Sequence, residues 1–168
     1  ATDLAAFRDM VNAGNDFEHE IVYLMNDIDI SGYPNWEPIG TWKDDTTNKP
    51  FKGIFKSNGS DTFTVSGLSI DATVTSPSTN TVFGLFGYTE GVTLERINVS
   101  ATKVSASSSA EHLFAGVLVG KIWDGSIIDC SASGAVLATG GSSTTFTGAG
   151  GLAGDANNIS NSYATGSA

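Results

Sequence analysis

The sequence predicts an all-β fold, a solenoid of stacked parallel β-strands with an α-helical cap at its N-terminal end. Three observations lead to this prediction. Similar side chains recur at intervals of a little over thirty residues. Within each interval, the composition and the two-residue alternation of apolar side chains are those of strands. The first 14 residues, by contrast, have the apolar spacing of a helix.

Two sets of residues mark the repeat. The first set is four phenylalanines separated by 32, 31 and 32 residues, namely Phe51, Phe83, Phe114 and Phe146. The second set is three tetrads whose last glycines lie 33 and 34 residues apart, namely Gly84–Gly87, Val117–Gly120 and Gly151–Gly154, with an earlier partial copy at Gly53-Ile54-Phe55. A repeat of this length indicates units that bury their apolar faces against one another.

Ankyrin and tetratricopeptide arrays have repeats of similar length, but their units contain helices with 3.6-residue apolar spacing. Here the units are rich in Val, Ile, Thr, Ser and Gly, which favours strands. Aligning the units on the tetrads places apolar residues at three shared positions, namely Val65, Leu94 and Ile127; Leu68, Ile97 and Cys130; and Ile70, Val99 and Ala132. We therefore expect these residues to stack in successive coils about 4.8 Å apart.

The N-terminal segment is expected to close one end of the stack. Leu4, Phe7, Met10 and Val11 form one apolar stripe on a helix over residues 2–13. A helix laid across the first coil buries this stripe and covers unpaired strand edges. The prediction is a single domain over residues 1–168, with a helical cap at 1–14 and about four coils over 21–168.

Four polar segments each precede one of the phenylalanines of the repeat. They are Thr41–Pro50, Asp71–Thr81, Ala101–Leu113 and Ala138–Thr145. In a stack of coils, segments at one phase of the repeat project from one edge. Because recurrent insertions on a rigid scaffold commonly carry binding sites, we expect any ligand to bind on this side.

These motifs resemble, in order along the chain, those of the GLUG-motif family, which is found in bacterial surface adhesins and in the N-terminal region of IgA-specific metallopeptidases. The resembling segments are the tetrads, Asn26–Ile30, Trp36–Thr41, Phe51–Phe55, Ser66–Ile70 and Asn161–Gly166. The resemblance implies a right-handed parallel β-helix on a secreted or surface-anchored bacterial protein. The sequence departs from the family pattern at Val117, where the tetrad usually has glycine, and at Lys56–Asp61. Family members usually continue past such a strand, so we expect this chain to be a piece of a longer protein.

Charge and composition argue against several classes of partner. The net charge is −10 and the isoelectric point is near 4.3, so we expect neither nucleic acid nor an anionic membrane to bind the chain. The sequence has no stretch that predicts insertion into a membrane. The single cysteine, Cys130, permits no intrachain disulfide and is expected to be a buried thiol.

The sequence predicts no catalytic residue and no cofactor. A metallopeptidase requires two histidines one helical turn apart, whereas His19 and His112 are distant in the sequence. The carboxylates that could bind calcium form two pairs, Asp27 with Asp29 and Asp44 with Asp45. A solvated surface is the simpler interpretation of both pairs.

Aromatic side chains are the candidate ligand-binding groups. Tyr33, Trp42 and Trp123 offer rings that can stack on sugars, whereas Trp36 is expected to lie in the core. The leading prediction is a non-catalytic adhesin or stalk module at the cell surface that presents loops to a host protein or a glycan. One alternative is a non-catalytic region of an IgA-protease-like or carbohydrate-active secreted enzyme. Another is a β-helix polysaccharide lyase or hydrolase, since one fold can serve all three functions. An uncapped last coil also predicts end-to-end self-association.

Overall fold

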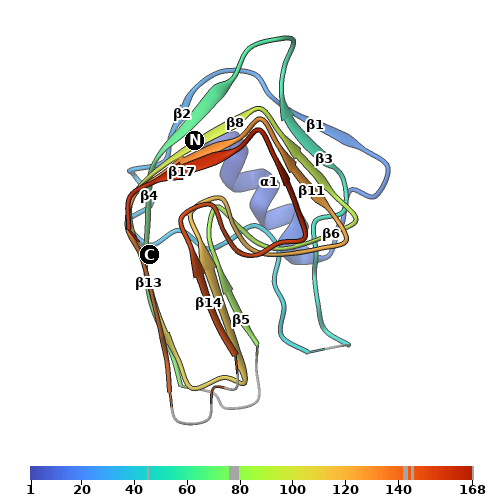
Figure 1. Ribbon diagram of the computed structural model, residues 1–168. Helices are drawn as coiled ribbons and strands as arrows, with labels where there is room; N and C mark the ends of the chain where they lie inside the picture. The colour runs from blue at the N-terminus through green and yellow to red at the C-terminus, as the bar shows by residue number, and fades with distance from the viewer. Residues whose placement is uncertain (45, 76–79, 142–143, 145, 168) are drawn as a thin grey trace.

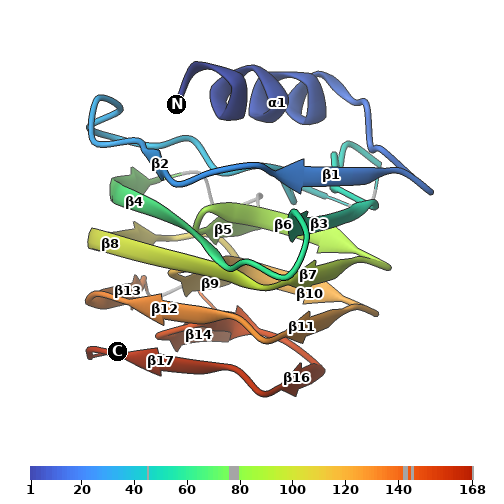
Figure 2. The ribbon, with the colours of Figure 1, turned by 90° about the horizontal axis from the view of Figure 1, so that it is seen from above.

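The chain folds into a solenoid of parallel strands. A computed structural model describes residues 1–44, 46–75, 80–141, 144 and 146–167, so the calcium candidate Asp45 lies outside the described residues. Figure 1 looks along the solenoid axis, and the coils nearly superimpose. Figure 2 shows the same coils as a stack, with the helix at one end and the last strand at the other. The chain makes about four turns, as predicted.

Four parallel sheets run along the stack. The first sheet contains β1 (Ile21–Leu24), β3 (Ile54–Ser57), β7 (Thr93–Glu95), β11 (Ser126–Ile128) and β16 (Asn158–Ser160). The second sheet contains β2 (Ile28–Asp29), β4 (Phe63–Val74), β8 (Ile97–Ser108), β12 (Ser131–Ser133), β13 (Val136–Gly140) and β17 (Tyr163–Thr165). The third sheet contains β5 (Thr81–Phe83), β9 (His112–Gly116) and β14 (Phe146–Gly150). The fourth sheet contains β6 (Phe86–Glu90), β10 (Val119–Trp123) and β15 (Ala153–Asp155).

The solenoid is right-handed. After β7, the chain passes through the second, third and fourth sheets in turn and re-enters the first sheet at β11. In Figure 1 the C-terminal coil is nearest the viewer, and the path of each coil turns counter-clockwise from the first sheet, at β11, through the second sheet, at β8 and β17, and down to β13. A path that turns counter-clockwise while approaching the viewer is a right-handed coil, as the family resemblance implied.

The coils are not simple triangles, because an arm projects from the body of the solenoid. β4 and β8 are each 12 residues long, and their second halves run outwards together with β13. The third sheet returns alongside them, and Val104 on β8 and Leu113 on β9 are both fully buried in the core. Three of the four predicted polar segments therefore contribute strand residues to this arm, and their residues 76–79, 142, 143 and 145 lie outside the described part of the chain. Residues 41–50 instead form a separate loop, closed by an antiparallel bridge between Thr41 and Lys49.

Helix α1 (Thr2–Ala13) caps the first coil, as predicted. It buries Leu4, Phe7 and Val11 against the core, and Gly14 ends it in the left-handed conformation, with φ at 111°. Met10 was predicted to join the buried stripe, but its side chain is 47% exposed. The reason is angular: Met10 lies about 60° further round the helix than Phe7, away from the coil.

Stacking follows the predicted register between the third and fourth coils but not between the second and the third. Leu94 pairs with Ile127, and Val99 with Ala132, as the alignment on the tetrads predicted. Val65 was expected to share the position of Leu94, but it pairs with Val99. The predicted alignment of the second coil was therefore wrong by one strand of the repeat.

The error arose from the partial copy of the tetrad at Gly53-Ile54-Phe55. Phe55 pairs with Leu94, so this segment belongs to the first sheet and not to the fourth. The first coil's counterpart of the tetrad is the segment at Ile39, which bridges to Phe86. Glycine spacing alone could not reveal this, because the first coil makes irregular turns where the later coils make an arm.

The four phenylalanines that mark the repeat do not form one ladder. Phe83 pairs with Ala115, so Phe114 lies one residue out of register with it. Because successive side chains of a strand point to opposite faces, Phe83 faces the core and Phe114 faces outwards. Phe51 is buried in the core, whereas Phe146 is 59% exposed. The predicted interval of the repeat was correct, but it did not reveal that Phe114 and Phe146 lie on the outer side of their strands and Phe83 on the inner side.

Val117, the departure from the tetrad pattern, is an extra residue in its corner. Between the third and fourth sheets, the third coil has one residue more than the second, although Phe86 and Val119 remain paired. Gly116 takes the tight position, where an added Cβ would lie 2.7 Å from the Cα of Ala153. Val117 itself is fully buried.

Candidate functional site

A groove follows the inner corner between the arm and the body of the solenoid, and we call it the corner groove. Its volume is about 480 Å³, which is within the range of small-ligand sites. The outer faces of the third and fourth sheets form its two sides, beside the 41–50 loop. Its aromatic lining consists of Trp42, Tyr88, Phe114, Trp123 and Phe146. Its polar lining consists of Asn48, His112, Lys121 and Asp155.

The tetrads position the floor of the corner groove. Their last glycines lie where the fourth sheet packs directly on the third. A Cβ added at Gly120 would lie 2.7 Å from the backbone nitrogen of Phe83, and one added at Gly154 would lie 2.6 Å from that of Ala115. The next residue in each strand points to the opposite face. The residues that follow the three tetrads therefore form one outward ladder, Tyr88, Lys121 and Asp155.

Trp42 fills the corner groove at the end nearest the first coil. Its ring lies 5.9 Å from that of Tyr88 on the floor, 6.0 Å from that of Phe114 on the wall and 5.5 Å from that of His112. His112 is held in turn by Asn80, whose Oδ1 lies 2.9 Å from its Nδ1. The space that remains lies over the third and fourth coils.

The carboxylate of Asp44 orders the loop that carries Trp42. It accepts hydrogen bonds from the backbone N–H groups of Thr46 and Thr47, at 2.8 and 2.9 Å, and from both hydroxyl groups. These bonds, led by that from the Thr47 hydroxyl, lower the pKa of Asp44 well below its usual range. Asp44 was a calcium candidate, and the structure gives it this local role.

Lys121 occupies the centre of the corner groove. Its side chain is almost buried, at 8% exposure, and its ammonium group forms an ion pair with Asp155 in the next coil. The same ammonium lies over three aromatic rings, 4.7 Å from the centroid of Phe114, 5.2 Å from that of Trp42 and 5.4 Å from that of Trp123. Such contacts between a cation and ring faces are attractive. Lys121 therefore holds the two tryptophans and the floor in one arrangement.

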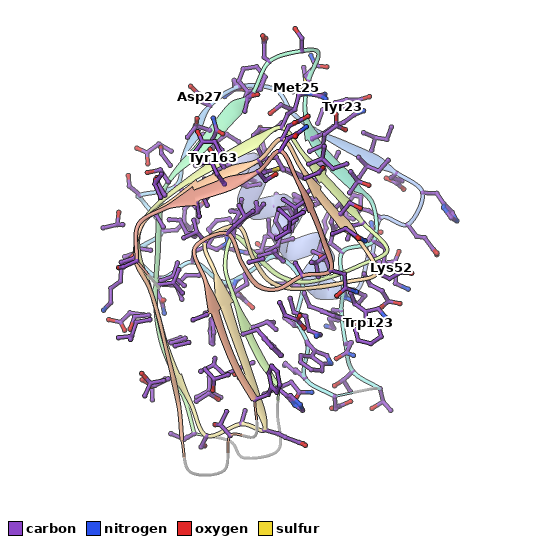
Figure 3. All side chains as sticks on the ribbon, viewed as in Figure 1. Tyr23, Met25, Asp27, Lys52, Trp123 and Tyr163 are labelled. Atoms are coloured by element: carbon purple, nitrogen blue, oxygen red, sulfur yellow. The ribbon has the colours of Figure 1, made fainter. Side chains whose placement is uncertain are left out.

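The accessible part of the corner groove combines two rings and one carboxylate. Trp123 and Phe146 are 57% and 59% exposed, and Asp155 lies with them in the lining. Figure 3 shows Trp123 on the side of the body from which the arm projects. Flat apolar faces beside a hydrogen-bond acceptor can bind a flat, hydroxylated ligand.

The structure brings together two of the three predicted ligand-binding aromatics. Trp42 and Trp123 share the corner groove, although 81 positions separate them in the sequence. Tyr33 lies elsewhere, half-buried beside Trp36 at a ring distance of 5.6 Å, with the guanidinium of Arg8 over its ring. Trp36 is in the core, as predicted, and donates its indole N–H to the carbonyl oxygen of Leu85 at 3.1 Å.

The other two described calcium candidates act as hydrogen-bond acceptors for the backbone. Asp27 accepts the N–H of Thr64 at 2.7 Å, and Asp29 accepts the N–H of Ser31 at 2.8 Å. The bond from Ser31 lowers the pKa of Asp29. Within the described part of the chain, no three His, Cys, Asp or Glu side chains come together as a metal site would require.

The sequence interpretation missed Lys121, Asp155, Tyr88 and Phe146. The signal for three of them was present, because Tyr88, Lys121 and Asp155 each follow the last glycine of a tetrad or of its equivalent turn. Because tyrosine, lysine and aspartate differ chemically, the three residues were not recognised as occupying the same position of the repeat. Phe146 was recognised as part of the repeat, but its position on the surface was not predicted.

No protein-family model, curated protein or solved structure matches the chain. The resemblance to the GLUG-motif family therefore stays a prediction. None of the helices in the described residues has the length and apolar character needed to span a bilayer.

Proposed function

We propose that this chain is a non-catalytic saccharide-binding module of a bacterial cell-surface or secreted protein, with the corner groove as its binding site. The observation that carries the proposal is that Trp42 and Trp123 meet in one groove, beside the exposed ring of Phe146. Aromatic faces stack on the apolar faces of sugar rings. The carboxylate of Asp155 can accept hydrogen bonds from sugar hydroxyl groups.

The chemistry of the corner groove favours binding over cleavage. Glycoside hydrolysis generally uses two carboxyl groups on either side of the scissile bond. Among the described residues that line the groove, Asp155 supplies one carboxylate, and that carboxylate is paired with Lys121. We therefore expect bound saccharides to be released unchanged.

The scaffold suits an adhesin or a stalk. Stacked coils hold a binding surface at a fixed distance from the rest of a protein, and each coil contributes residues to one extended face. The resemblance of the tetrads to those of bacterial surface proteins supports the same role. We place the chain outside the cell on that basis, with a host or environmental glycan as its ligand.

A panel of immobilised oligosaccharides tests the proposal. We expect the wild-type chain to bind some members, and soluble members to be recovered intact by chromatography. Trp123→Ala and Phe146→Ala should each weaken binding about tenfold or more, because each removes a stacking surface.

Tyr163→Ala is the matched control. Tyr163 is also an exposed aromatic residue of the later coils, at 64% exposure, but Figure 3 shows it on a different side of the body from Trp123. Its removal should leave binding unchanged. If no oligosaccharide binds, or if Trp123→Ala binds as well as the wild type while remaining folded, the proposal is wrong.

A further inference from the structure

The positive charge in the corner groove already has a partner. Lys121 is the lysine among the described lining residues, and its ammonium group is paired with Asp155 and covered by three rings. An incoming carboxylate or sulfate would have to displace Asp155 to reach it. The pair contributes no net charge, so the lining residues that the structure describes offer no unpaired lysine or arginine to attract an acidic ligand.

Two acidic residues flank the accessible ring. Glu90 pairs in register with Trp123 on the neighbouring strand, and Asp124 directly follows Trp123. The whole chain carries a net charge of −10. An anionic ligand that approaches Trp123 therefore meets repulsion at short and at long range.

We propose that the ion pair between Lys121 and Asp155 makes the corner groove selective for neutral saccharides over acidic ones. This proposal rests on the saccharide-binding function proposed above. The sugar ring stacks on Trp123, and its hydroxyl groups donate hydrogen bonds to Asp155. Asp155 is thus a specificity-determining residue. It accepts hydrogen bonds from hydroxyl groups, and its ion pair with Lys121 prevents a ligand carboxylate from binding that ammonium group.

Matched pairs of oligosaccharides provide the test. The probes are gluco-, galacto- and manno-oligosaccharides, each compared with the uronate oligomer of the same length and linkage. We expect the wild-type chain to bind the neutral member of any pair it recognises at least about tenfold more tightly. This measurement needs no variant, so it stands even if a substitution in the groove impairs folding.

The variant Asp155→Asn gives the sharper result. It keeps the size of the side chain and leaves the charge of Lys121 without its partner. We expect the ratio of the affinities for the neutral and the acidic members to fall at least about tenfold, because the affinity for the uronate oligomer increases. Lys121→Gln is the control: it removes the cation and keeps Asp155, so it should not gain uronate binding. Circular dichroism and thermal unfolding establish that each variant is folded.

The outcomes separate the two proposals. If the wild type prefers uronates, and Trp123→Ala abolishes that binding, the selectivity proposal is overturned while the binding function stands. If Asp155→Asn folds and gains no affinity for uronates, the role of Asp155 is overturned. If no member of any pair binds, the proposed function itself fails.

Discussion

The ring of Phe7, on helix α1, meets the ring of Phe51, in the first coil, edge to face with the centroids 5.4 Å apart. Phe7 also lies 5.7 Å from Phe55 and 5.1 Å from Phe17. This cluster joins the cap to the stack. The helix is therefore an integral part of the core and not an appendage.

We expect Phe7→Ala to lower the free energy of unfolding by about 3–5 kcal/mol, because it leaves a cavity between the helix and the first coil. Chemical denaturation measures the change. Met10→Ala, on the exposed side of the same helix, should alter it by no more than about 0.5 kcal/mol. Equal effects of the two substitutions would show that the helix does not pack as described.

Replacing the glycines that end the tetrads, even by alanine, is expected to lower stability. A Cβ at Gly120 would lie 2.7 Å from the backbone nitrogen of Phe83 and 2.9 Å from the backbone oxygen of Gly87. We expect Gly120→Ala to cost about 1–3 kcal/mol of stability through overpacking. At Gly32 no atom lies within 4 Å of an added Cβ, so Gly32→Ala should be neutral or stabilising by up to about 1 kcal/mol. Melting temperatures of the two variants in the opposite order would contradict this.

Asp29 should contribute to stability in a pH-dependent way. The N–H of Ser31 lowers the pKa of Asp29 in the folded state, so folding is favoured when Asp29 is ionised. This stabilisation is present above the unfolded-state pKa of about 3.9 and is lost as the pH falls through the lower folded-state value. The melting temperatures of the wild type and Asp29→Asn should therefore differ at pH 6 and converge below about pH 4. A constant difference across this range would exclude the mechanism.

The thiol of Cys130 should be inert in the folded protein. Cys130 is buried, and this burial raises its pKa to about 11, so little thiolate forms at pH 8. We expect a colourimetric thiol reagent to react with the native chain only as fast as the chain unfolds, and to react promptly in denaturant. Rapid, stoichiometric labelling of the native chain would mean that the coil opens at this position.

The last coil should mediate self-association of this chain. Among the described residues, strands β14 to β17 each pair with a strand on one side only, whereas helix α1 covers the opposite end of the stack. Two copies can therefore join by their last coils about a two-fold axis, which closes at a dimer and does not form filaments. Sedimentation velocity over a concentration series should show a monomer and a dimer, with less dimer for Ile159→Lys. Longer polymers, or a dimer insensitive to Ile159→Lys, would contradict this arrangement.

The sequence by itself determined the class of fold. A repeat of a little over thirty residues with strand-like alternation admits few structures other than stacked parallel coils, because each unit must bury its apolar face on the next. The 3.6-residue spacing of apolar side chains over residues 2–13 likewise identified the helical cap. These are consequences of local periodicity, which the chain carries from residue to residue.

Tertiary structure decided where the candidate binding face lies. Phe114 lies one residue out of register with Phe83, so the ring of Phe114 points outwards and that of Phe83 lies in the core. The interval between repeats does not reveal a shift of a single residue. The corner groove exists because the coils fold back on themselves as an arm, which brings Trp42 of the first coil to Lys121 and Trp123 of the third. Contacts between side chains that distant in the sequence depend on the path of the whole chain. Periodicity in the sequence therefore predicted the stack, and only the path of the chain in space could place the groove.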